Sequence, residues 1–190
     1  MLLRWALVCC IAALVAAGGW SCRGRSETMH PSPLTVTSTA FAEGQTIPRR
    51  YTGEGEDLSP PLAFSGVPPQ AAELALVCSD PDAPVGTWYH WVLYGLAPDV
   101  TSLPEGLPRQ AQLQTPVAAK QGRNSWPSDN VGYRGPMPPR GHGRHRYIFT
   151  LYALDQPVTL PPEEATAERL LAAIRGHILA QGQLMGTYQR

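Results

Sequence analysis

The sequence predicts a mainly β domain with few helices, and three observations support this prediction. The chain has 190 residues, which is enough for one ordinary domain with a single core. Its 20 prolines and 18 glycines are spread without a collagen-like period, so they interrupt helices and leave short strands and shaped loops. Hydrophobic residues make up 43% of the chain and charged residues 16%, a composition that folds rather than remaining disordered.

The charge balance argues against a polyanionic partner. Lys plus Arg and Asp plus Glu number 15 each, which gives a formal net charge of zero. Without a net positive field, the protein has no long-range attraction to nucleic acid. We therefore expect no nucleic-acid partner.

The N-terminal segment has the pattern of a secretory signal. Arg4 is the only charged residue before the apolar stretch Trp5–Ala17, which is followed by Gly18 and Gly19. The stretch is shorter than the roughly 18 to 20 residues that span a bilayer as a helix. We therefore expect residues 1–21 to be a signal peptide that is removed, and the protein to be exported.

Cys22 is a candidate for lipidation, because it comes shortly after the apolar stretch and its small residues. A small residue precedes it, as in a bacterial lipobox, but the Leu-like first residue of that motif is missing. Two alternatives stay open: a lipoprotein anchored in the membrane through Cys22, or ordinary cleavage after Ala17 or a nearby residue and release to the periplasm. Residues 22–33 are polar and unpatterned, which is typical of a tether.

The cysteines exclude a disulfide framework. Cys9 and Cys10 fall within the predicted signal peptide, so the mature chain keeps only Cys22 and Cys78. Cys78 ends an apolar run and is expected to be a small buried hydrophobic residue rather than a reactive thiol.

The domain is expected to cover residues 34–190. In its first six residues, every second residue is a threonine, and the residues between them are Leu34, Val36 and Ser38. This alternation predicts a first strand. Residues 46–51 are predicted as a second short strand, confined to a sheet edge because Pro48 has no N–H to donate.

Three longer runs predict the main strands. Leu74–Ser79 is apolar and short enough for a buried strand, His90–Leu96 follows it, and Arg146–Leu154 is rich in aromatic and β-branched residues. The prolines of Ser59–Leu62 are expected to interrupt the chain before these strands. Residues Ala97–Val131 have no sustained period and form a loop-like excursion that is either functional or packed in an ordered way.

The alternation within His90–Leu96 predicts which side chains share a face. We expect one face to carry His90, Val92 and Tyr94 and the other to carry Trp91 and Leu93.

One helix is predicted, over Ala165–Ala180 near the C-terminus. Thr166 is expected to cap its start. Its apolar stripe, which we expect to pack on the core, consists of Leu170, Leu171, Ile174 and Ile178.

Two aspartates follow the buried strand directly. Prolines 81 and 84 stiffen the turn that holds Asp80 and Asp82, so both carboxylates are presented at a rigid strand end. An ordinary turn, in which the carboxylates accept backbone N–H bonds, explains the same residues.

A second cluster of polar residues follows the Gly- and Pro-rich run 132–143. His145 and Tyr147 should share a strand face and can donate hydrogen bonds to an anion, and the preceding run can bring backbone N–H groups close to a ligand. A local basic patch is expected from Arg134, Arg140, Arg144 and Arg146. These residues therefore predict a phosphate-sized site.

Three stretches of the chain match a known family. They are Asp80-Pro81-Asp82-Ala83-Pro84, His90-Trp91-Val92, and the run from Tyr133 to Tyr147. Together they resemble the two signature regions of the phosphatidylethanolamine-binding protein (PEBP) family, and the bacterial branch, the Raf kinase inhibitor-like proteins, is the nearer match. The resemblance extends from about Thr37 to the C-terminus.

The resemblance implies a β-sandwich-like fold with few helices and a small anion pocket at one end. In family members, the pocket is lined by residues that match Asp80, Asp82, Trp88, His90, Pro138, His145 and Tyr147. The two histidines and the tyrosine can donate to phosphate oxygens, and an aspartate can orient a histidine or meet an ammonium headgroup. Met137 stands where bacterial relatives often have Cys, so this pocket wall should be bulkier.

Three function classes follow. We expect a non-catalytic binding protein of the bacterial envelope, with a phosphate- or phosphoethanolamine-type ligand or a phospholipid headgroup, and without a cofactor. The alternative is a protein-interaction regulator, such as a protease or kinase inhibitor, that uses Ala97–Val131 as its contact surface. A metal-dependent hydrolase is a third class, although the chain lacks His-Glu-x-x-His and Gly-x-Ser-x-Gly motifs. Some bacterial members of the family are dimers, so a homodimer stays open.

Overall fold

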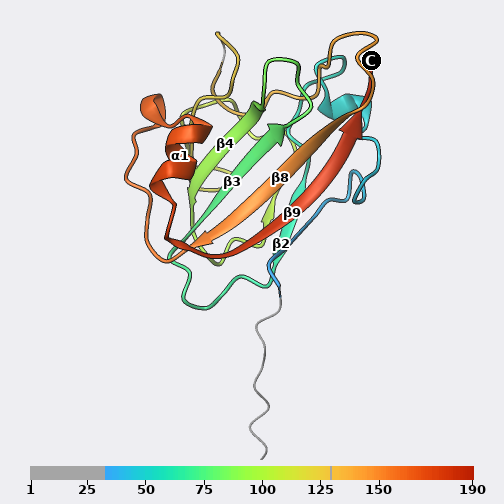
Figure 1. Cartoon of the computed structure of the whole chain (residues 1–190). Helices are drawn as coiled ribbons and strands as arrows, with labels where there is room; N and C mark the ends of the chain where they lie inside the picture. The colour runs from blue at the N-terminus through green and yellow to red at the C-terminus, as the bar shows by residue number, and fades with distance from the viewer. Residues whose placement is uncertain (1–32, 129) are drawn as a thin grey trace, which may run out of the picture. The chain divides into compact units, whose positions relative to one another are not determined.

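The structure is a computed structural model that describes residues 33–128 and 130–190 (Figure 1). The signal peptide predicted at 1–21 lies outside these residues, as does the lipidation candidate Cys22 and all but the last residue of the tether predicted at 22–33. In the described part of the chain, no helix is long and apolar enough to cross a membrane.

Two antiparallel sheets build the domain, which confirms the predicted mainly β fold. The small sheet has the strand order β1-β2-β5, and the large sheet has the order β6-β7-β4-β3-β8-β9. The strands are β1 (Thr35–Thr37), β2 (Leu62–Ser65), β3 (Glu73–Asp80), β4 (Trp88–Leu96), β5 (Ser102–Leu103), β6 (Gln112–Leu113), β7 (Ala119–Gln121), β8 (His145–Leu154) and β9 (Ile178–Tyr188).

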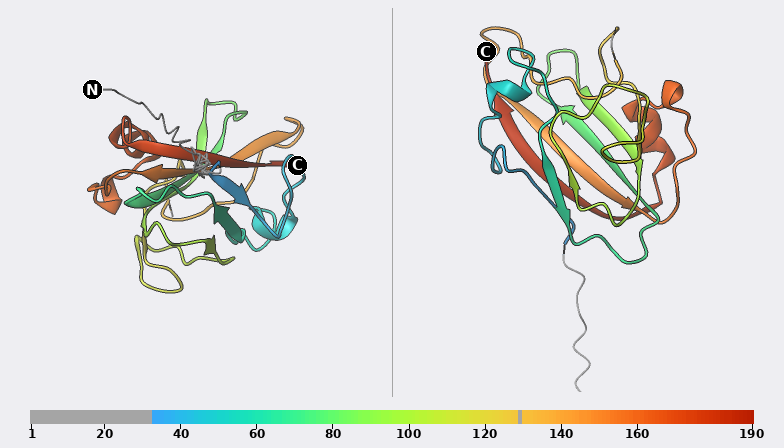
Figure 2. Two further views of the ribbon diagram at one scale, coloured as in Figure 1. Left: turned by 90° about the horizontal axis from the view of Figure 1, so that it is seen from below. Right: turned by 180° about the vertical axis from the view of Figure 1, so that it is seen from behind.

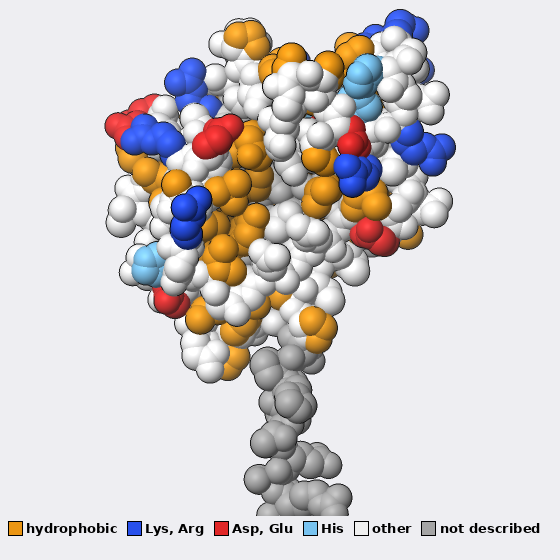
Figure 3. All heavy atoms as spheres, viewed as in Figure 1, with side chains coloured by type: hydrophobic (Ala, Val, Ile, Leu, Met, Phe, Trp, Pro, Cys, Tyr) orange, Lys and Arg blue, Asp and Glu red, His pale blue; other side chains and the backbone are white. Residues whose placement is uncertain are grey.

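On the face shown in Figure 3, acidic and basic side chains are interspersed, in line with the zero net charge.

The main core lies between the two sheets. Val36 of β1 and Phe64 of β2 are buried in one cluster with Trp91 of β4 and Phe149 of β8. Figure 2 shows the small sheet lying across one face of the large sheet. Burying a large apolar side chain contributes about 1.5–3 kcal/mol, so this interface holds the sheets together.

The opposite face of the large sheet is covered by the helix α1 (Ala167–Ala173). Leu170 and Ile174 of this region pack with Val77 of β3 and Tyr94 of β4 in a second buried cluster. With a core on each side, the central strands are buried on both faces, and this is why β3 reads as an almost unbroken apolar run.

β4 contains a bulge at His90. Cys78 pairs with Trp91 and Ser79 pairs with Tyr89, so His90 has no partner residue on β3. An extra residue of this kind interrupts the alternation of side chains and re-aims the ones beside it.

The bulge changes the face of the sheet on which one predicted residue lies. Val92 and Tyr94 pack in the helix-side cluster and Trp91 packs in the main core, as predicted. Grouping His90 with Val92 and Tyr94 is wrong, because the His90 ring lies 5.0 Å, edge-on, from the ring of Tyr147 in the main core. The bulge therefore turns His90 to the face that carries the candidate site.

The C-terminal region differs from the prediction. Thr166 caps the helix as expected, with its hydroxyl accepting from the Arg169 N–H, but α1 ends at Ala173 rather than near Ala180. Gly176 then adopts a φ of 86°, and the chain continues as the 11-residue edge strand β9. The sequence prediction missed β9 because its first residues are good helix formers and its exposed half shows no clear alternation.

The prediction for residues 46–51 is also wrong. Arg49–Tyr51 is a 3-10 turn, closed by the Tyr51 N–H donating to the Pro48 carbonyl at 2.9 Å. Thr46 forms only an isolated bridge with Thr187.

The described part of the excursion Ala97–Val131 is packed in an ordered way, as one of the two alternatives predicts. It contributes β5 to the small sheet and β6 and β7 to the large sheet. The interruption predicted at Ser59–Leu62 is shorter than expected, because β2 already begins at Leu62. A second 3-10 turn covers Pro162–Glu164.

Candidate functional site

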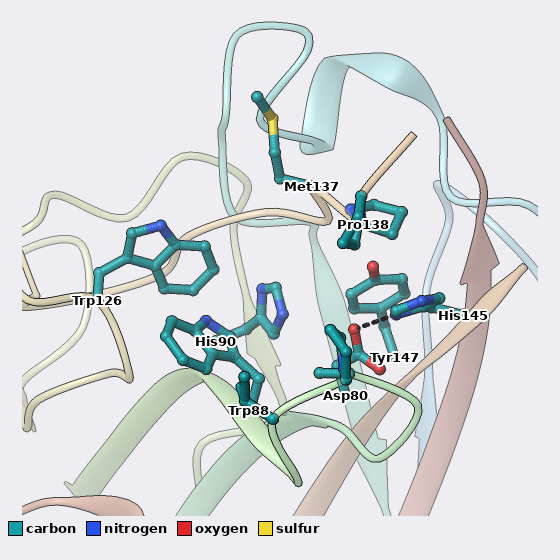
Figure 4. A pocket seen from close by; sticks show the side chains of 12 residues that line it. Asp80, Trp88, His90, Trp126, Met137, Pro138, His145 and Tyr147 are labelled. Carbon is teal, nitrogen blue, oxygen red and sulfur yellow. Dashed lines mark hydrogen bonds and ion pairs between the residues drawn. The ribbon is translucent and has the colours of Figure 1, made fainter. Parts of the chain in front are cut away.

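The candidate site lies at the end of the large sheet where β3 ends and β4 and β8 begin. Because β3 runs antiparallel to both neighbours, its last residue, Asp80, comes beside Trp88 of β4 and close to His145 of β8. The prolines after Asp80 end β3, and the Gly- and Pro-rich run before His145 delays the start of β8. Side chains from all three strands therefore converge (Figure 4).

A cavity of about 330 Å³ opens between these strand ends (Figure 4). This volume is at the lower end of the range of small-molecule sites. Val85 and Met137 are the exposed large hydrophobic residues of its described lining, with 75% and 44% of their surface accessible. The cavity is lined by Asp80, Ala83, Pro84, Val85, Trp88, His90, Trp126, Met137, Pro138, Pro139, His145 and Tyr147.

Six of the seven predicted ligand-binding residues are in this lining, and Asp82 is not. Asp82 lies beyond the cavity wall, where both of its carboxylate oxygens accept from the Arg146 guanidinium, at 2.9 and 2.7 Å. It also accepts from the Arg146 backbone N–H at 2.9 Å. These hydrogen bonds lower the pKa of Asp82 to about 2 and tie the β3–β4 hairpin to the start of β8.

Asp80 orients His145. The Asp80 Oδ2 atom lies 2.7 Å from His145 Nδ1, and the two side chains are only 5% and 2% exposed. A carboxylate can only accept, so His145 Nδ1 carries the proton and donates it. The Asp80 Oδ1 atom accepts from the Asp82 N–H at 2.9 Å, which fixes the carboxylate in turn.

Tyr147 supplies a buried hydroxyl that has no hydrogen-bond partner among the described residues. Burial raises the pKa of Tyr147, and the nearby Asp80 carboxylate raises it further, so the hydroxyl keeps its proton. Leaving such a donor unpaired in a protein interior costs about 1–3 kcal/mol. An acceptor atom of a ligand would relieve this cost.

His90 is a neutral ring with one nitrogen already engaged. Burial lowers the pKa of His90 to about 4, so the ring is uncharged near neutral pH. Its Nδ1 lies 2.6 Å from the carbonyl oxygen of Arg134 and must donate to it. The other nitrogen, Nε2, is then an acceptor, so donation from His90 to a phosphate oxygen would require the protonated ring.

Trp126 is the main lining residue that the sequence reasoning missed. Its ring lies 5.4 Å from Trp88 and 4.9 Å from His90, edge-on to both. It comes from the excursion Ala97–Val131, whose last part packs against the strand ends. A tryptophan within a run of Asn, Ser and Pro was the available signal, since such a large apolar side chain is rarely left in a polar loop without a packing partner.

The predicted basic patch is largely neutralised. Three of its four arginines are paired with carboxylates: Arg134 with Asp57 at 3.3 Å, Arg140 with Glu54 at 3.8 Å and Arg146 with Asp82 at 2.7 Å. No arginine or lysine belongs to the described lining of the cavity. The arginines therefore brace the loops around the site.

A second cavity, of about 520 Å³, lies between β1 and β9. Glu43 is the one ionisable residue of its described lining, and none of the predicted site residues is there. We therefore take the smaller cavity as the candidate site, because its described lining carries several ionisable side chains and that of the larger cavity carries one. Across residues 33–128 and 130–190, no group of three or more His, Cys, Asp or Glu side chains could hold a metal ion.

Comparison with known families gives one result for nearly the whole described domain. The family model described as phosphatidylethanolamine-binding protein matches residues 37–189. A UPF0098 protein of Pyrococcus horikoshii is 41% identical over 180 residues, covering 95% of this chain and 87% of its own. A UPF0098 protein of Methanothermobacter thermautotrophicus is 46% identical over 157 residues, covering 83% of this chain and 99% of its own.

Solved structures show the same similarity. A PEBP homolog from Chlamydia trachomatis is similar with a TM-score of 0.73 and 41% identity, covering 83% of this chain and 98% of that chain. Escherichia coli YbcL, described as a member of the mammalian PEBP family, is similar with a TM-score of 0.75 and 28% identity, covering 84% of this chain and 99% of that chain.

Proposed function

Because this chain belongs to the phosphatidylethanolamine-binding protein family, we propose that it is a non-catalytic binding protein for a small ligand with a phosphoryl group. Phosphate, phosphoethanolamine and a phospholipid headgroup are ligands of this class. The ligand would occupy the cavity between the ends of β3, β4 and β8.

The observation that carries this proposal is the unpartnered hydroxyl of Tyr147 beside His145. Within the described part of the chain, Tyr147 is a protonated donor without an acceptor, and the Asp80 carboxylate holds His145 so that its Nε2 atom points away from Asp80. A phosphoryl oxygen that takes the place of the His142 nitrogen, which lies 2.7 Å from His145 Nε2, could accept from both groups at once. Hydrogen bonds between a charged partner and buried donors contribute about 1.5–3 kcal/mol each, which supports specific binding at this small site.

A zwitterionic ligand suits the remaining lining. The described lining has no Lys or Arg, so a phosphoryl group brings negative charge that the cavity only partly balances. His90 Nε2 can accept a hydrogen bond, and the rings of Trp88 and Trp126 lie beside it (Figure 4). An ammonium group could donate to His90 or lie against an indole ring.

We also propose that the protein works outside the cytoplasm. The sequence pattern of residues 1–21 supports export, and Cys22 supports a lipid anchor as one of two possibilities. The intact mass of the protein isolated from the cell envelope tests both. A mature chain that begins at Cys22 with added acyl groups supports the lipoprotein, whereas an unmodified mature terminus supports the soluble form and a retained N-terminus contradicts export.

Calorimetric titration of the purified protein tests the ligand class. Phosphate, phosphoethanolamine and glycerophosphoethanolamine are titrated into the wild type, His145→Ala and His177→Ala, the last being a matched control far from the cavity. We expect saturable binding to the wild type and the control and at least tenfold weaker binding to His145→Ala. A parallel rise in melting temperature should accompany binding.

Failure to bind at millimolar concentration would contradict the proposal. The search would then turn to protein partners, for which the excursion Ala97–Val131 is the surface to test by deletion.

A further inference from the structure

His142 is outside the lining of the candidate site, yet it contacts one residue of that lining directly. It lies in the loop before β8 and is exposed, outside the lining of the cavity. Its Nδ1 atom is 2.7 Å from His145 Nε2, and the two rings are 4.9 Å apart at 63°. The result is a continuous chain of hydrogen bonds from Asp80 through His145 to His142.

This contact uses the last polar position of His145. Each imidazole nitrogen makes one hydrogen bond in the plane of the ring, either as a donor or as an acceptor. Nδ1 of His145 is engaged with Asp80, and Nε2 is engaged with His142. Whichever ring carries the shared proton, His145 cannot donate to a ligand while His142 stays in place.

The loop that carries His142 can release it without disturbing the core. Gly141 and Gly143 flank it with φ values of 74° and 92°, and a Cβ atom at either glycine would meet nothing within 4 Å. The backbone of His142 is held by one turn hydrogen bond, from its N–H to the Pro139 carbonyl at 3.1 Å. Moving the His142 ring therefore breaks a single side-chain hydrogen bond.

We propose that His142 is an internal competitor for the anion position on His145. This inference rests on the proposed function, because a ligand oxyanion takes the place of the His142 nitrogen at His145 Nε2. His145 then donates from both nitrogens, to Asp80 and to the ligand, and is an imidazolium.

The proton balance follows from the two starting arrangements. If the shared proton resides on His145 before binding, the ring keeps it when His142 leaves. If it resides on His142, His145 gains one proton from solvent or from a protonated ligand oxygen. The charged and titratable groups around His145 are Asp80, Asp82 with its partner Arg146, His142 and Tyr147.

The competition also predicts ligand selectivity. An anion gains from the charge of the imidazolium, whereas a neutral hydroxyl compound gains less and still has to displace His142. The site should therefore select a phosphoryl group over an uncharged alcohol of the same size. Removing His142 should reduce this selectivity.

Titration of inorganic phosphate into wild type, His142→Ala and His177→Ala tests the competition. His177→Ala is the matched control, because it removes an exposed histidine that pairs with Asp155 instead. We expect His142→Ala to bind phosphate about threefold to tenfold more tightly than wild type, the loss of one competing hydrogen bond, and His177→Ala to be unchanged. Unchanged or weaker binding to His142→Ala overturns the inference while leaving the proposed function in place.

The hydrogen bond itself is measured without ligand. Nitrogen-15 shifts of the histidine side chains in wild type and His142→Ala should differ at His145 and agree at His90. An unchanged His145 signal overturns the inference independently of phosphate. If the His145 signal changes and phosphate binds to neither protein, the proposed function fails and the inference fails with it.

Discussion

Two histidine–aspartate pairs lie at opposite ends of β8, and they consist of the same residue types but differ in burial. His145 and Asp80 are 2.7 Å apart at the start of the strand and are 2% and 5% exposed. His177 and Asp155 are 3.0 Å apart beyond its end and are 38% and 46% exposed. The same two residue types lie in the candidate site in one case and at a surface turn in the other.

Burial explains the difference. Water screens the exposed pair, so its interaction contributes about 0–1 kcal/mol and its side chains remain free to find other partners. The buried pair has lost its hydration and depends on each further hydrogen bond, such as the Asp82 N–H on Asp80 and His142 on His145. A buried pair therefore holds its geometry, which is what a binding site needs.

The largest effect should come from breaking the buried pair. Asp80→Asn removes the negative charge that faces His145 Nδ1 and replaces one acceptor oxygen by a donor. We expect a loss of about 3–5 kcal/mol in the free energy of unfolding, measured by urea denaturation. A loss below about 1 kcal/mol would show that the buried pair is no different from an exposed one.

A second effect extends the comparison to His90, a buried histidine without an acidic partner. The pKa of His90 is lowered from 6.5 to about 4, so the unfolded chain takes up a proton at this residue before the folded protein does. The stability that His90 contributes is complete above pH 6.5 and is lost as the pH falls toward 4. The loss should approach about 3 kcal/mol.

Urea denaturation across this pH range, in wild type and in His90→Gln, measures the loss. The free energy of unfolding of the wild type minus that of His90→Gln should increase from pH 4 to pH 6.5 and stay constant above pH 6.5. His177→Gln serves as the control and should keep the slope of the wild type. A pH-independent difference between wild type and His90→Gln would contradict the assigned pKa.

A third effect separates binding from stability at Tyr147. Tyr147→Phe removes a buried hydroxyl that has no partner among the described residues, so the free energy of unfolding should be unchanged or slightly higher. Phosphate affinity should fall about fivefold to tenfold, because one donor to the ligand is lost. Thermal denaturation and calorimetry of the same samples measure the two quantities. A variant that loses stability but keeps its affinity would assign the hydroxyl a structural role.

The smallest effect should come from breaking the exposed pair. Asp155→Asn removes the charge facing His177 but leaves the Asp155 N–H bound to the His177 carbonyl at 3.0 Å. We expect a loss of no more than about 1 kcal/mol in the free energy of unfolding, and less at high salt. Equal losses for Asp155→Asn and Asp80→Asn would remove the contrast between the two ends of β8.

Much of the fold and most of the site could be predicted from short stretches of sequence. The apolar runs of β3, β4 and β8 mark strands because apolar side chains at strand length need burial whatever they pack against. The motifs around Asp80 and His145 resemble the signature regions of one family, and that resemblance implies that they share a pocket. The family resemblance drawn from them is confirmed, and six of seven predicted residues line one cavity.

The errors occur where a residue's role depends on a distant partner. His90 leaves its predicted face because β4 slips past β3 by one residue, and Asp82 leaves the site because Arg146 holds it outside. Trp126 enters the site from an excursion that has no pattern of its own. β9 is a strand because β8 pairs with it along its length, against the local preference for helix.

The sequence by itself determined the mainly β class, the apolar strands and the polar residues gathered at their ends. These depend on the local periodicity of side chains and on the chemistry of each residue type. Only the tertiary structure decided which histidine is buried with an aspartate, which nitrogen each ring has left to offer, and that His142 contacts His145. Those properties depend on register, burial and distances between residues far apart in the chain, and burial changes the energy of one and the same ion pair several-fold.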